Sequence, residues 1–296
     1  MREFKDVQSQ ASKISIAINK VGVKGVKLPI RIKRGSEVNN LVAIFDVFVD
    51  IPKDRKGADM SRAVESINTV ALSDENHFSI EEIASKIGEE ALRRFEYSTN
   101  AFVKLKTELF HRVKSESGKI SVVNYPLTAE AIVERAGKTE TSIEVEVTGI
   151  NACPCAMETA RTIIGNNNSK IDGMLDSIPG ITHNQRNHVK IKLTVENDEN
   201  IEAFELINSA EKVLGGSLLP VLKRIDEGEM VVRAHSNPMF VEDIVRFIVA
   251  DIIKNKDISD NSKIEVSSES EESIHPHNAF ATISGSIGEF RKNNSS

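Results

Sequence analysis

The order of extended and helical segments occurs twice along the chain, and this repeat constrains the fold more than any other feature. In the first half, runs rich in β-branched residues are followed by two segments with helical spacing and then by two further extended runs. The predicted strands are 15–33, 40–51, 101–113 and 119–135, and the predicted helices are 60–71 and 79–95. Ser79 followed by Glu82 gives the second helix an N-cap pattern.

The second half has the same order of elements. Its predicted strands are 141–150, 188–195, 264–268 and 279–287, and its predicted helices are 202–214 and 240–253. We therefore predict an α+β fold of two tandem ββααββ units, with antiparallel sheets and helices packed on one face. The boundary is predicted near Gly137, which gives domains 1–137 and 138–296. Outside the repeat, 165–180 is predicted to be an inserted polar loop and 291–296 a frayed tail.

The composition excludes several classes of protein. The 296 residues carry a formal net charge of −6, so a non-specific nucleic-acid binder is not expected. Two cysteines are too few for a disulfide scaffold. The first residues lack the apolar stretch of a signal peptide, and no window approaches the ~20 apolar residues of a membrane span. We therefore expect a cytoplasmic protein with reduced cysteines, no nucleic-acid partner and no membrane contact.

Cys153, Pro154 and Cys155 directly follow a predicted strand and form the first candidate site. Residues two apart in an extended chain face the same side, but the proline leaves the directions of these two thiols open. Reduced cysteines are free to bind a metal or to act as nucleophiles. The alternative is that both are small buried side chains.

Two motifs with histidine are the next candidates. The segment 182–186 offers an imidazole for a metal, two amides for a base edge and a guanidinium for phosphate, or it is a solvated loop. These side chains are His183, Asn184, Gln185 and Arg186. In the second motif, Pro276 favours an extended backbone that points the imidazoles of His275 and His277 to one side. Such a pair suits a metal or a proton relay, and the alternative is an exposed turn.

A fourth candidate is the charged segment 223–229 together with 237–243. Glu242 and Asp243 stand at the start of a predicted helix, where the positive end of the helix dipole favours carboxylates. That role alone accounts for both residues, so their sequence position leaves a functional role open.

Taken together, these motifs resemble those of the type IB GTP cyclohydrolases over nearly the whole chain. The matching segments, in the family's order, are 152–156, 182–186, 223–227, 237–243 and 273–277, and 57–62 resembles the family's first-domain motif. The long span between Cys155 and His183 resembles the archaeal branch of the family rather than the bacterial one. One departure is Asp59, where the family usually has His, so the role of that position is open.

The resemblance implies the tunnelling fold, with two ββααββ units in one chain. It implies a homo-oligomer, a dimer or a tetramer, whose sites lie at subunit interfaces. It also implies Fe²⁺ as the metal that activates water, and the same mixed ligand set is compatible with Zn²⁺ or Mn²⁺. The implied ligands are Cys153, His183 and Glu227, with His275 and His277 as further ligands or proton carriers.

GTP is the substrate that the resemblance implies. Glu242 would accept both donors of the guanine N1–H and N2–H₂ edge. The other implied substrate-binding residues are Asn184, Gln185, Arg186, Lys223 and Arg224, with Ser61 and Arg62 of the first-domain motif, Arg62 coming from a neighbouring subunit. The residues expected to take part in catalysis are Cys153, Glu242, His275 and His277.

The archaeal branch implies ring opening at C8 of guanine, loss of formate and pyrophosphate, and formation of 7,8-dihydroneopterin 2′,3′-cyclic phosphate for tetrahydromethanopterin synthesis. The loop 165–180 would either shape the phosphate end of the site or be passive. One alternative is a GTP cyclohydrolase I that stops at 7,8-dihydroneopterin triphosphate. Others are an NADPH-dependent nitrile reductase with a nucleophilic cysteine on the same fold, and a non-catalytic assembly protein with a structural metal.

Overall fold

The structure is a computed structural model that describes residues 6–34, 37–73, 77–167, 172–196 and 202–294. The strands are β1 (Ile18–Arg34), β2 (Glu37–Ile51), β3 (Asn100–Lys114), β4 (Ile120–Glu134), β5 (Thr139–Ala152), β6 (Asn184–Glu196), β7 (Lys263–Ser270) and β8 (Ala279–Ser286). The helices are α1 (Met60–Ala71), α2 (Ile80–Arg94), α3 (Pro154–Asn167), α4 (Ala203–Leu214), α5 (Arg224–Ser236), α6 (Val241–Ile252) and α7 (Ile287–Asn293), and η1 (Asp172–Ser177) is a short 3₁₀ helix.

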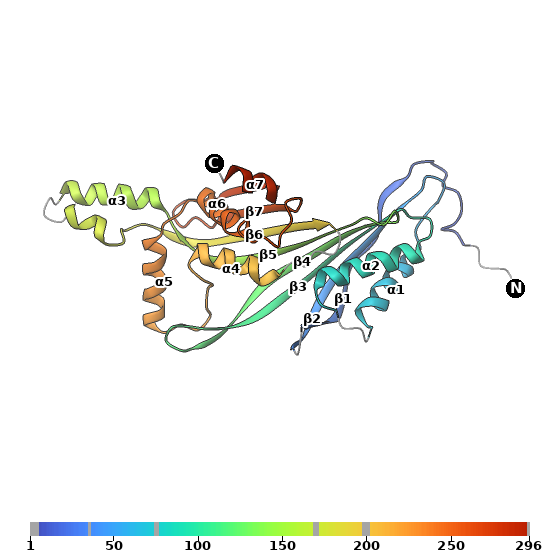
Figure 1. The fold of residues 1–296 in the computed structure, drawn as a ribbon, viewed down its shortest axis with the longest axis horizontal. Coiled ribbons are helices and arrows are strands. Elements are labelled where there is room, and N and C mark those ends of the chain that lie inside the picture. Colours follow the sequence, from blue (N-terminus) through green and yellow to red (C-terminus); the bar gives the residue numbers. More distant parts are fainter. Residues whose placement is uncertain (1–5, 35–36, 74–76, 168–171, 197–201, 295–296) are drawn as a thin grey trace. The chain divides into compact units, whose positions relative to one another are not determined.

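The strands are hydrogen-bonded in chain order from β1 to β8 (Figure 1). The pairs β1–β2, β2–β3 and β7–β8 are antiparallel. The residues group into two compact units that are interleaved in the sequence. The first is made of Met1–Leu109, Pro126–Glu144 and Thr194–Asn200, and the second of Phe110–Tyr125, Val145–Leu193 and Ile201–Ser296.

In the first unit, the alternation along β2 sends every second side chain into the core. Phe45, Val47 and Val49 are at most 1% exposed, and each such burial stabilises the fold by about 1.5–3 kcal/mol. Helix α1 packs against α2 and β1, so the buried faces of both helices cover this strand pair (Figure 1). The Ser79 hydroxyl accepts the N–H of Glu82 at 3.1 Å and caps α2. The predicted strand and helix order of the first half is therefore confirmed.

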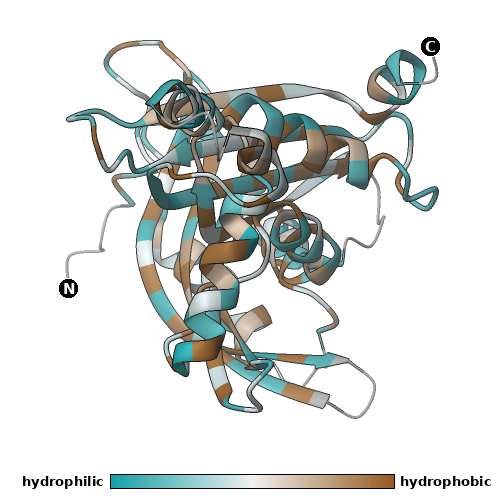
Figure 2. Ribbon diagram, turned by 90° about the vertical axis from the view of Figure 1, so that its left-hand side faces the viewer, coloured by the Kyte–Doolittle hydropathy of each residue, from teal (hydrophilic) through white to brown (hydrophobic). Residues whose placement is uncertain are grey.

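In the second unit, buried and more exposed side chains alternate along β5 and β6 in the same way. Figure 2 shows hydrophilic and hydrophobic residues alternating along the strands. Helix α6 packs against α4, β7 and β8. Gly149 of β5 is needed for close packing, because a Cβ at this position would lie 2.6 Å from the Leu214 Cβ of α4. The predicted strands and the two predicted helices of the second half are present, so the α+β prediction is confirmed.

Three helices of the described chain, α3, α5 and α7, were not predicted. Two expectations are wrong because α3 and α7 lie where a loop and a tail were expected. The expected loop 165–180 contains the end of α3 and the 3₁₀ helix η1, while residues 168–171 lie outside the described residues. The expected tail from Arg291 is instead the last turn of α7, up to Asn293, and residues 295–296 are not described. Arg291 donates to the carbonyl of Ile253 at 3.0 Å, and the Ser286 hydroxyl caps the helix.

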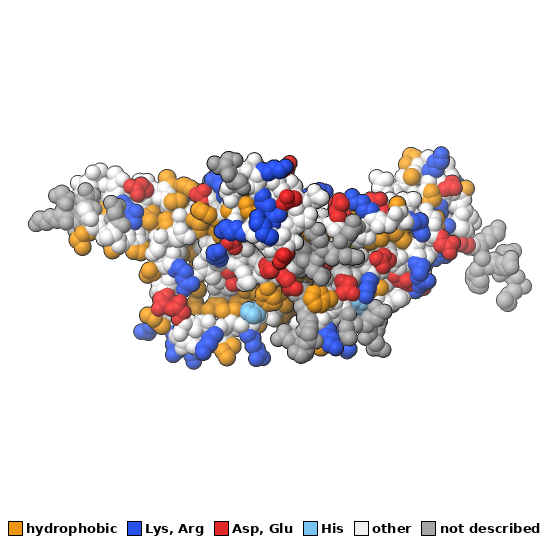
Figure 3. Space-filling model, in the orientation of Figure 1, with side chains coloured by type: hydrophobic (Ala, Val, Ile, Leu, Met, Phe, Trp, Pro, Cys, Tyr) orange, Lys and Arg blue, Asp and Glu red, His pale blue; other side chains and the backbone are white. Residues whose placement is uncertain are grey.

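The surface carries charges of both signs, and Figure 3 shows acidic and basic side chains interspersed on the face drawn. No helix in the described part of the chain is long and apolar enough to cross a membrane.

Candidate active site

Cys153 lies in the second unit, between the end of β5 and the start of α3. Pro154 occupies the first position of α3, where its missing N–H costs nothing and its fixed φ suits a helix. The N–H of Ala156 points at the Cys153 sulfur, with 3.5 Å between the two atoms. Both cysteines are free thiols, and Cys153 is partly buried while Cys155 is exposed. Of the two thiols, Cys153 is therefore the one held by its surroundings.

The main chain brings Cys153 beside His183, which is 30 positions later in the sequence. The N–H of Cys153 donates to the His183 carbonyl at 3.2 Å. The Thr182 hydroxyl donates to the Cys153 carbonyl at 2.7 Å. These two bonds hold the thiol motif and the histidine motif side by side, as a shared site requires.

The His183 imidazole is held by two further side chains. Its Nδ1 lies 2.8 Å from the Gln185 Oε1 and 3.6 Å from a carboxylate oxygen of Glu272. The side chains of His183 and Glu272 are only 10% and 11% exposed. Sequence analysis missed Glu272, and the available signal was an acidic pair, Glu271 and Glu272, directly before the motif with His275 and His277.

The two histidines of the motif 273–277 lie together, as the proline spacing predicts. The rings of His275 and His277 stack, with centroids 5.3 Å apart and planes 13° from parallel. Both residues are exposed in a bend that follows Glu272. The imidazole pair therefore lies on the same segment as Glu272, whose carboxylate lies close to the His183 ring.

The segment before Glu242 is tied to the strand end that carries Cys153. The N–H of Met239 donates to the Ala152 carbonyl at 3.2 Å, and the Asn151 amide donates to the Met239 carbonyl at 3.4 Å. Glu242 follows in the first turn of α6 and is exposed. The start of α6 is therefore anchored next to the thiol motif.

Helix α5 carries the predicted residues Lys223, Arg224 and Glu227 at its start, and all three are exposed. Near its other end, His235 Nε2 lies 3.4 Å from the Thr182 carbonyl. Glu227 precedes His235 by eight residues, which is about 12 Å along an α-helix. In the described part of the chain, no group of three or more His, Cys, Asp or Glu side chains could hold a metal ion. The structure thus brings Cys153 and His183 together without Glu227.

Asp226 fixes the start of α5 to the turn between β3 and β4. It accepts the N–H and hydroxyl of Ser117 at 2.9 and 2.6 Å and the N–H of Lys223 at 2.8 Å. Hydrogen bonds from the Ser117 hydroxyl and the Lys223 N–H lower the pKa of Asp226 to about 2. Asp226 therefore acts as an ionised anchor for the motif that contains Glu227.

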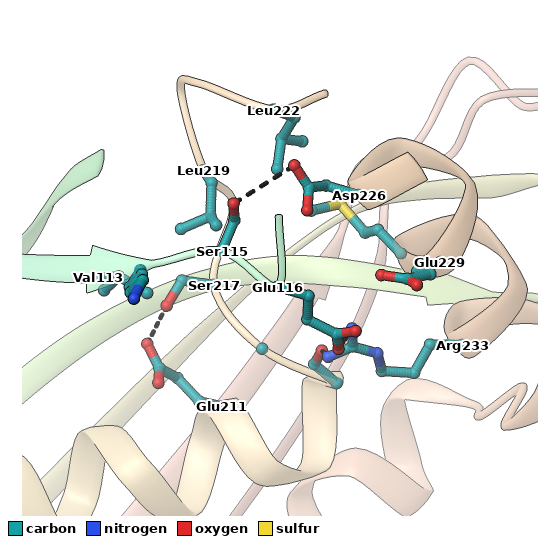
Figure 4. Close-up of a pocket in the computed structure, with 14 residues that line it drawn as sticks. Val113, Ser115, Glu116, Glu211, Ser217, Leu219, Leu222, Asp226, Glu229 and Arg233 are labelled. Carbon is teal, nitrogen blue, oxygen red and sulfur yellow. Dashed lines mark hydrogen bonds and ion pairs between the residues drawn. The ribbon is translucent and has the colours of Figure 1, made fainter. Parts of the chain in front are cut away.

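A pocket of about 280 Å³ lies beside this anchor, between the end of β3, the loop after α4 and α5 (Figure 4). Its carboxylates outnumber its cations, and Figure 4 shows Glu116, Glu229 and Arg233 gathered at one side. A hydrogen bond with the Glu116 carboxyl, together with burial, raises the pKa of Glu229. Because a triphosphate is strongly negative, this pocket does not suit the phosphate end of a nucleotide.

Ser61 and Arg62 lie on α1 in the first unit, where Ser61 is exposed and Arg62 is half-buried. A guanidinium nitrogen of Arg62 donates to the Arg94 carbonyl at 2.8 Å, and another lies 3.5 Å from the Asp59 carboxylate. Asp59 also pairs with Arg55 at 3.0 Å. Asp59 stands at the position where the resembling family usually has His. Its carboxylate forms ion pairs with both Arg55 and Arg62.

Solved structures with the same fold come from proteins of very different sequence. The chain aligns with a uricase from Arthrobacter globiformis with a TM-score of 0.54, 11% identity, and coverage of 93% of this chain and 96% of that one. A uricase from Bacillus fastidious aligns with a TM-score of 0.55, 10% identity, and coverage of 94% and 97%. These likenesses concern the fold alone, and they confirm the predicted tunnelling fold.

Sequence relatives are far closer. Residues 4–281 match the family described as type I GTP cyclohydrolase folE2. A protein named GTP cyclohydrolase MptA from Thermoplasma acidophilum is 42% identical over 293 residues, which cover 99% of each chain. A protein of the same name from Methanococcoides burtonii is 35% identical over 311 aligned positions, which cover 99% of this chain and 98% of the relative.

The chain therefore belongs to the type I GTP cyclohydrolase family. Within that family its relatives place it in the MptA branch, which confirms the resemblance seen in the motifs. The chain is accordingly an enzyme of the GTP cyclohydrolase class, and the family match favours this over a nitrile reductase or an assembly protein.

Proposed function

We propose that this enzyme opens the guanine ring of GTP at C8, releases formate, and forms 7,8-dihydroneopterin 2′,3′-cyclic phosphate with loss of pyrophosphate. The product would enter tetrahydromethanopterin biosynthesis in the cytoplasm. Relatives named GTP cyclohydrolase MptA support this reaction class. The observation that carries the proposal is the pairing of Cys153 with His183 at the ends of two neighbouring strands.

The donor atoms at this point fit a divalent transition metal. A cysteine sulfur and an imidazole suit Fe²⁺, which we propose, and also Zn²⁺ or Mn²⁺. The Nδ1 of His183 is already engaged, so its Nε2 is the atom left to bind a metal. A bound metal would supply hydroxide from water near neutral pH. We propose Glu227, His275 and His277 as the source of the remaining ligands.

Guanine recognition is assigned to Glu242 and Asn184. A carboxylate accepts the N1–H and N2–H₂ donors of guanine at once, and the exposed position of Glu242 leaves both oxygens accessible to a base. The residues proposed to hold the triphosphate are exposed, apart from the half-buried Arg62. They are Arg186, Lys223 and Arg224, with Ser61 and Arg62 supplied by a neighbouring subunit.

A neighbouring subunit is part of the proposal, because the first-domain motif would complete the site of another copy. We therefore propose a homo-oligomer, a dimer or a tetramer, built from tandem units 1–137 and 138–296. Size measurement in solution tests this proposal, and a monomer that turns over GTP would remove Arg62 from the site.

Proton transfers during ring opening are assigned to His275 and His277, since imidazole gives and takes protons near neutral pH. For the cyclic phosphate, a ribose-derived hydroxyl would attack the α-phosphorus in line. The bond from that phosphorus to the bridging oxygen breaks, and pyrophosphate leaves with its electron pair while the hydroxyl proton goes to an imidazole. Arg186 and Lys223 would neutralise the developing charge.

Mass spectrometry of the product tests the proposal directly. The protein is incubated with GTP and Fe²⁺ without oxygen, and the pterin product is weighed. A cyclic monophosphate with free pyrophosphate is expected, whereas an intact triphosphate on the pterin would instead give the GTP cyclohydrolase I reaction. A variant shortened between α3 and η1 tests the segment 165–180, and unchanged product from that variant would show that the segment is passive.

A further inference from the structure

The Gln185 side chain is buried between His183 and Glu272. Gln185 is 6% exposed, and both ends of its amide are engaged. Its Oε1 lies 2.8 Å from the Nδ1 of His183, and its Nε2 donates to a carboxylate oxygen of Glu272 at 3.2 Å. A side chain held in this way has little capacity left to contact a substrate base.

The chemistry of the three groups fixes the direction of each hydrogen bond. An ionised carboxylate only accepts, so Glu272 must face the NH₂ end of the Gln185 amide. The amide oxygen therefore faces His183, and an oxygen also only accepts. The hydrogen must then reside on Nδ1 of His183. In the neutral imidazole this leaves Nε2 unprotonated, with a lone pair available.

A second histidine and carboxylate pair lies next to this one and lacks the same arrangement. His188 Nε2 lies 3.0 Å from the Glu271 carboxylate, and its Nδ1 lies 3.1 Å from the Thr148 hydroxyl. Glu271 is 51% exposed, in contrast with 11% for Glu272. By the same argument, the Glu271 carboxylate favours a hydrogen on Nε2 of His188, which is the opposite tautomer, and Nδ1 lies 3.6 Å from a carboxylate oxygen of Glu146. The neighbouring pair therefore serves as a matched control.

We infer that Gln185 and Glu272 are positioning residues that hold His183 as the Nδ1–H tautomer and aim its Nε2 at the metal. This inference rests on the proposed function, in which His183 is a ligand. Histidines that bind metals commonly donate their other N–H to an oxygen, and loss of that partner typically weakens metal binding by about 10–100-fold. Gln185 thus acts through His183 and not on the base edge of the substrate.

The first test measures the tautomer in metal-free protein. Imidazole ¹⁵N shifts are recorded about two pH units above the ordinary histidine pKa of about 6.5, with His183→Asn used to assign the signal. Nδ1–H is expected in wild type, and a mixture with Nε2–H is expected in Gln185→Met and Glu272→Gln. Glu271→Gln should leave the His183 signal unchanged. An Nε2–H tautomer in wild type, or an unchanged signal in both variants, overturns the inference.

The second test measures metal affinity by competition with a chelator, using Co²⁺ and Fe²⁺, after thermal unfolding shows that each variant is folded. Gln185→Met and Glu272→Gln should bind about 10–100-fold more weakly than wild type, and Glu271→Gln should bind equally well. Equal affinity of wild type and both variants overturns the inference alone. A wild type that binds no metal overturns the proposed metal site and the inference with it.

Discussion

The N–H of Cys153 donates to the carbonyl of His183, so two residues from separate motifs are joined through their main chains. This bond lies where β5 ends and β6 begins. Because it uses no side-chain atom, the thiol and the imidazole both stay available for chemistry. Substitutions of either side chain therefore probe the site without breaking the contact that forms it.

Replacing Cys153 by alanine should abolish GTP turnover and weaken metal binding, because a thiolate ligand is lost. Cys155→Ala is the matched control, since Cys155 is exposed on the first turn of α3 and should matter much less. Metal content after dialysis and the rate of formate release check both effects. Equal activity and metal content in Cys153→Ala and wild type would remove Cys153 from the metal site.

Glu242→Gln should lower GTP turnover strongly and leave metal content unchanged. The substitution keeps the shape but places an NH₂ group against the donors of guanine, at a cost of about 2 kcal/mol or roughly thirty-fold in kcat/KM. Asp243→Asn is the control, because Asp243 pairs with Arg246 at 2.9 Å on the surface. A Glu242→Gln enzyme that loses its metal would move Glu242 into the ligand set.

Asp226→Asn should lower the melting temperature at neutral pH, because a carboxylate anchored by Ser117 and Lys223 is lost. The folded pKa of Asp226 is about 2, below its ordinary 3.8, so its stabilisation is complete above pH 3.8 and is lost as the pH falls through 2. The gap between wild type and variant should therefore shrink over that range. Asp257→Asn, at an exposed carboxylate, should show no such gap.

Glu229→Gln should raise the melting temperature at neutral pH. Because the Glu116 carboxyl raises the pKa of Glu229 above 4.5, the folded protein binds this proton more tightly than the unfolded chain does. Wild type thus loses stability as the pH rises from 4.5 through the raised pKa, whereas the variant does not. Thermal unfolding across this range checks the sign, and a variant that is less stable at pH 7 would contradict it.

Local sequence patterns predicted the strands and helices that bury only one face. Along β2 every second residue is buried, and the Ser79 cap marks the start of α2, so periodicity found both. Helix α5 lacks such a pattern, because Ile225, Val231 and Val232 are 46–60% exposed. Helix α3 buries little beyond Met157, and its initial proline suggested a turn. These helices escaped prediction because no single apolar face defines them.

The sequence by itself determined the alternation of the strands, the motifs and their order along the chain, since these depend on neighbouring residues. Only the tertiary structure decided that Glu272 holds Gln185, that Gln185 holds His183, and that His183 lies beside Cys153. Cys153 and Glu272 are 119 positions apart in the sequence. Contacts at that separation depend on strand register and on which buried polar groups find partners, and neither follows from local propensity.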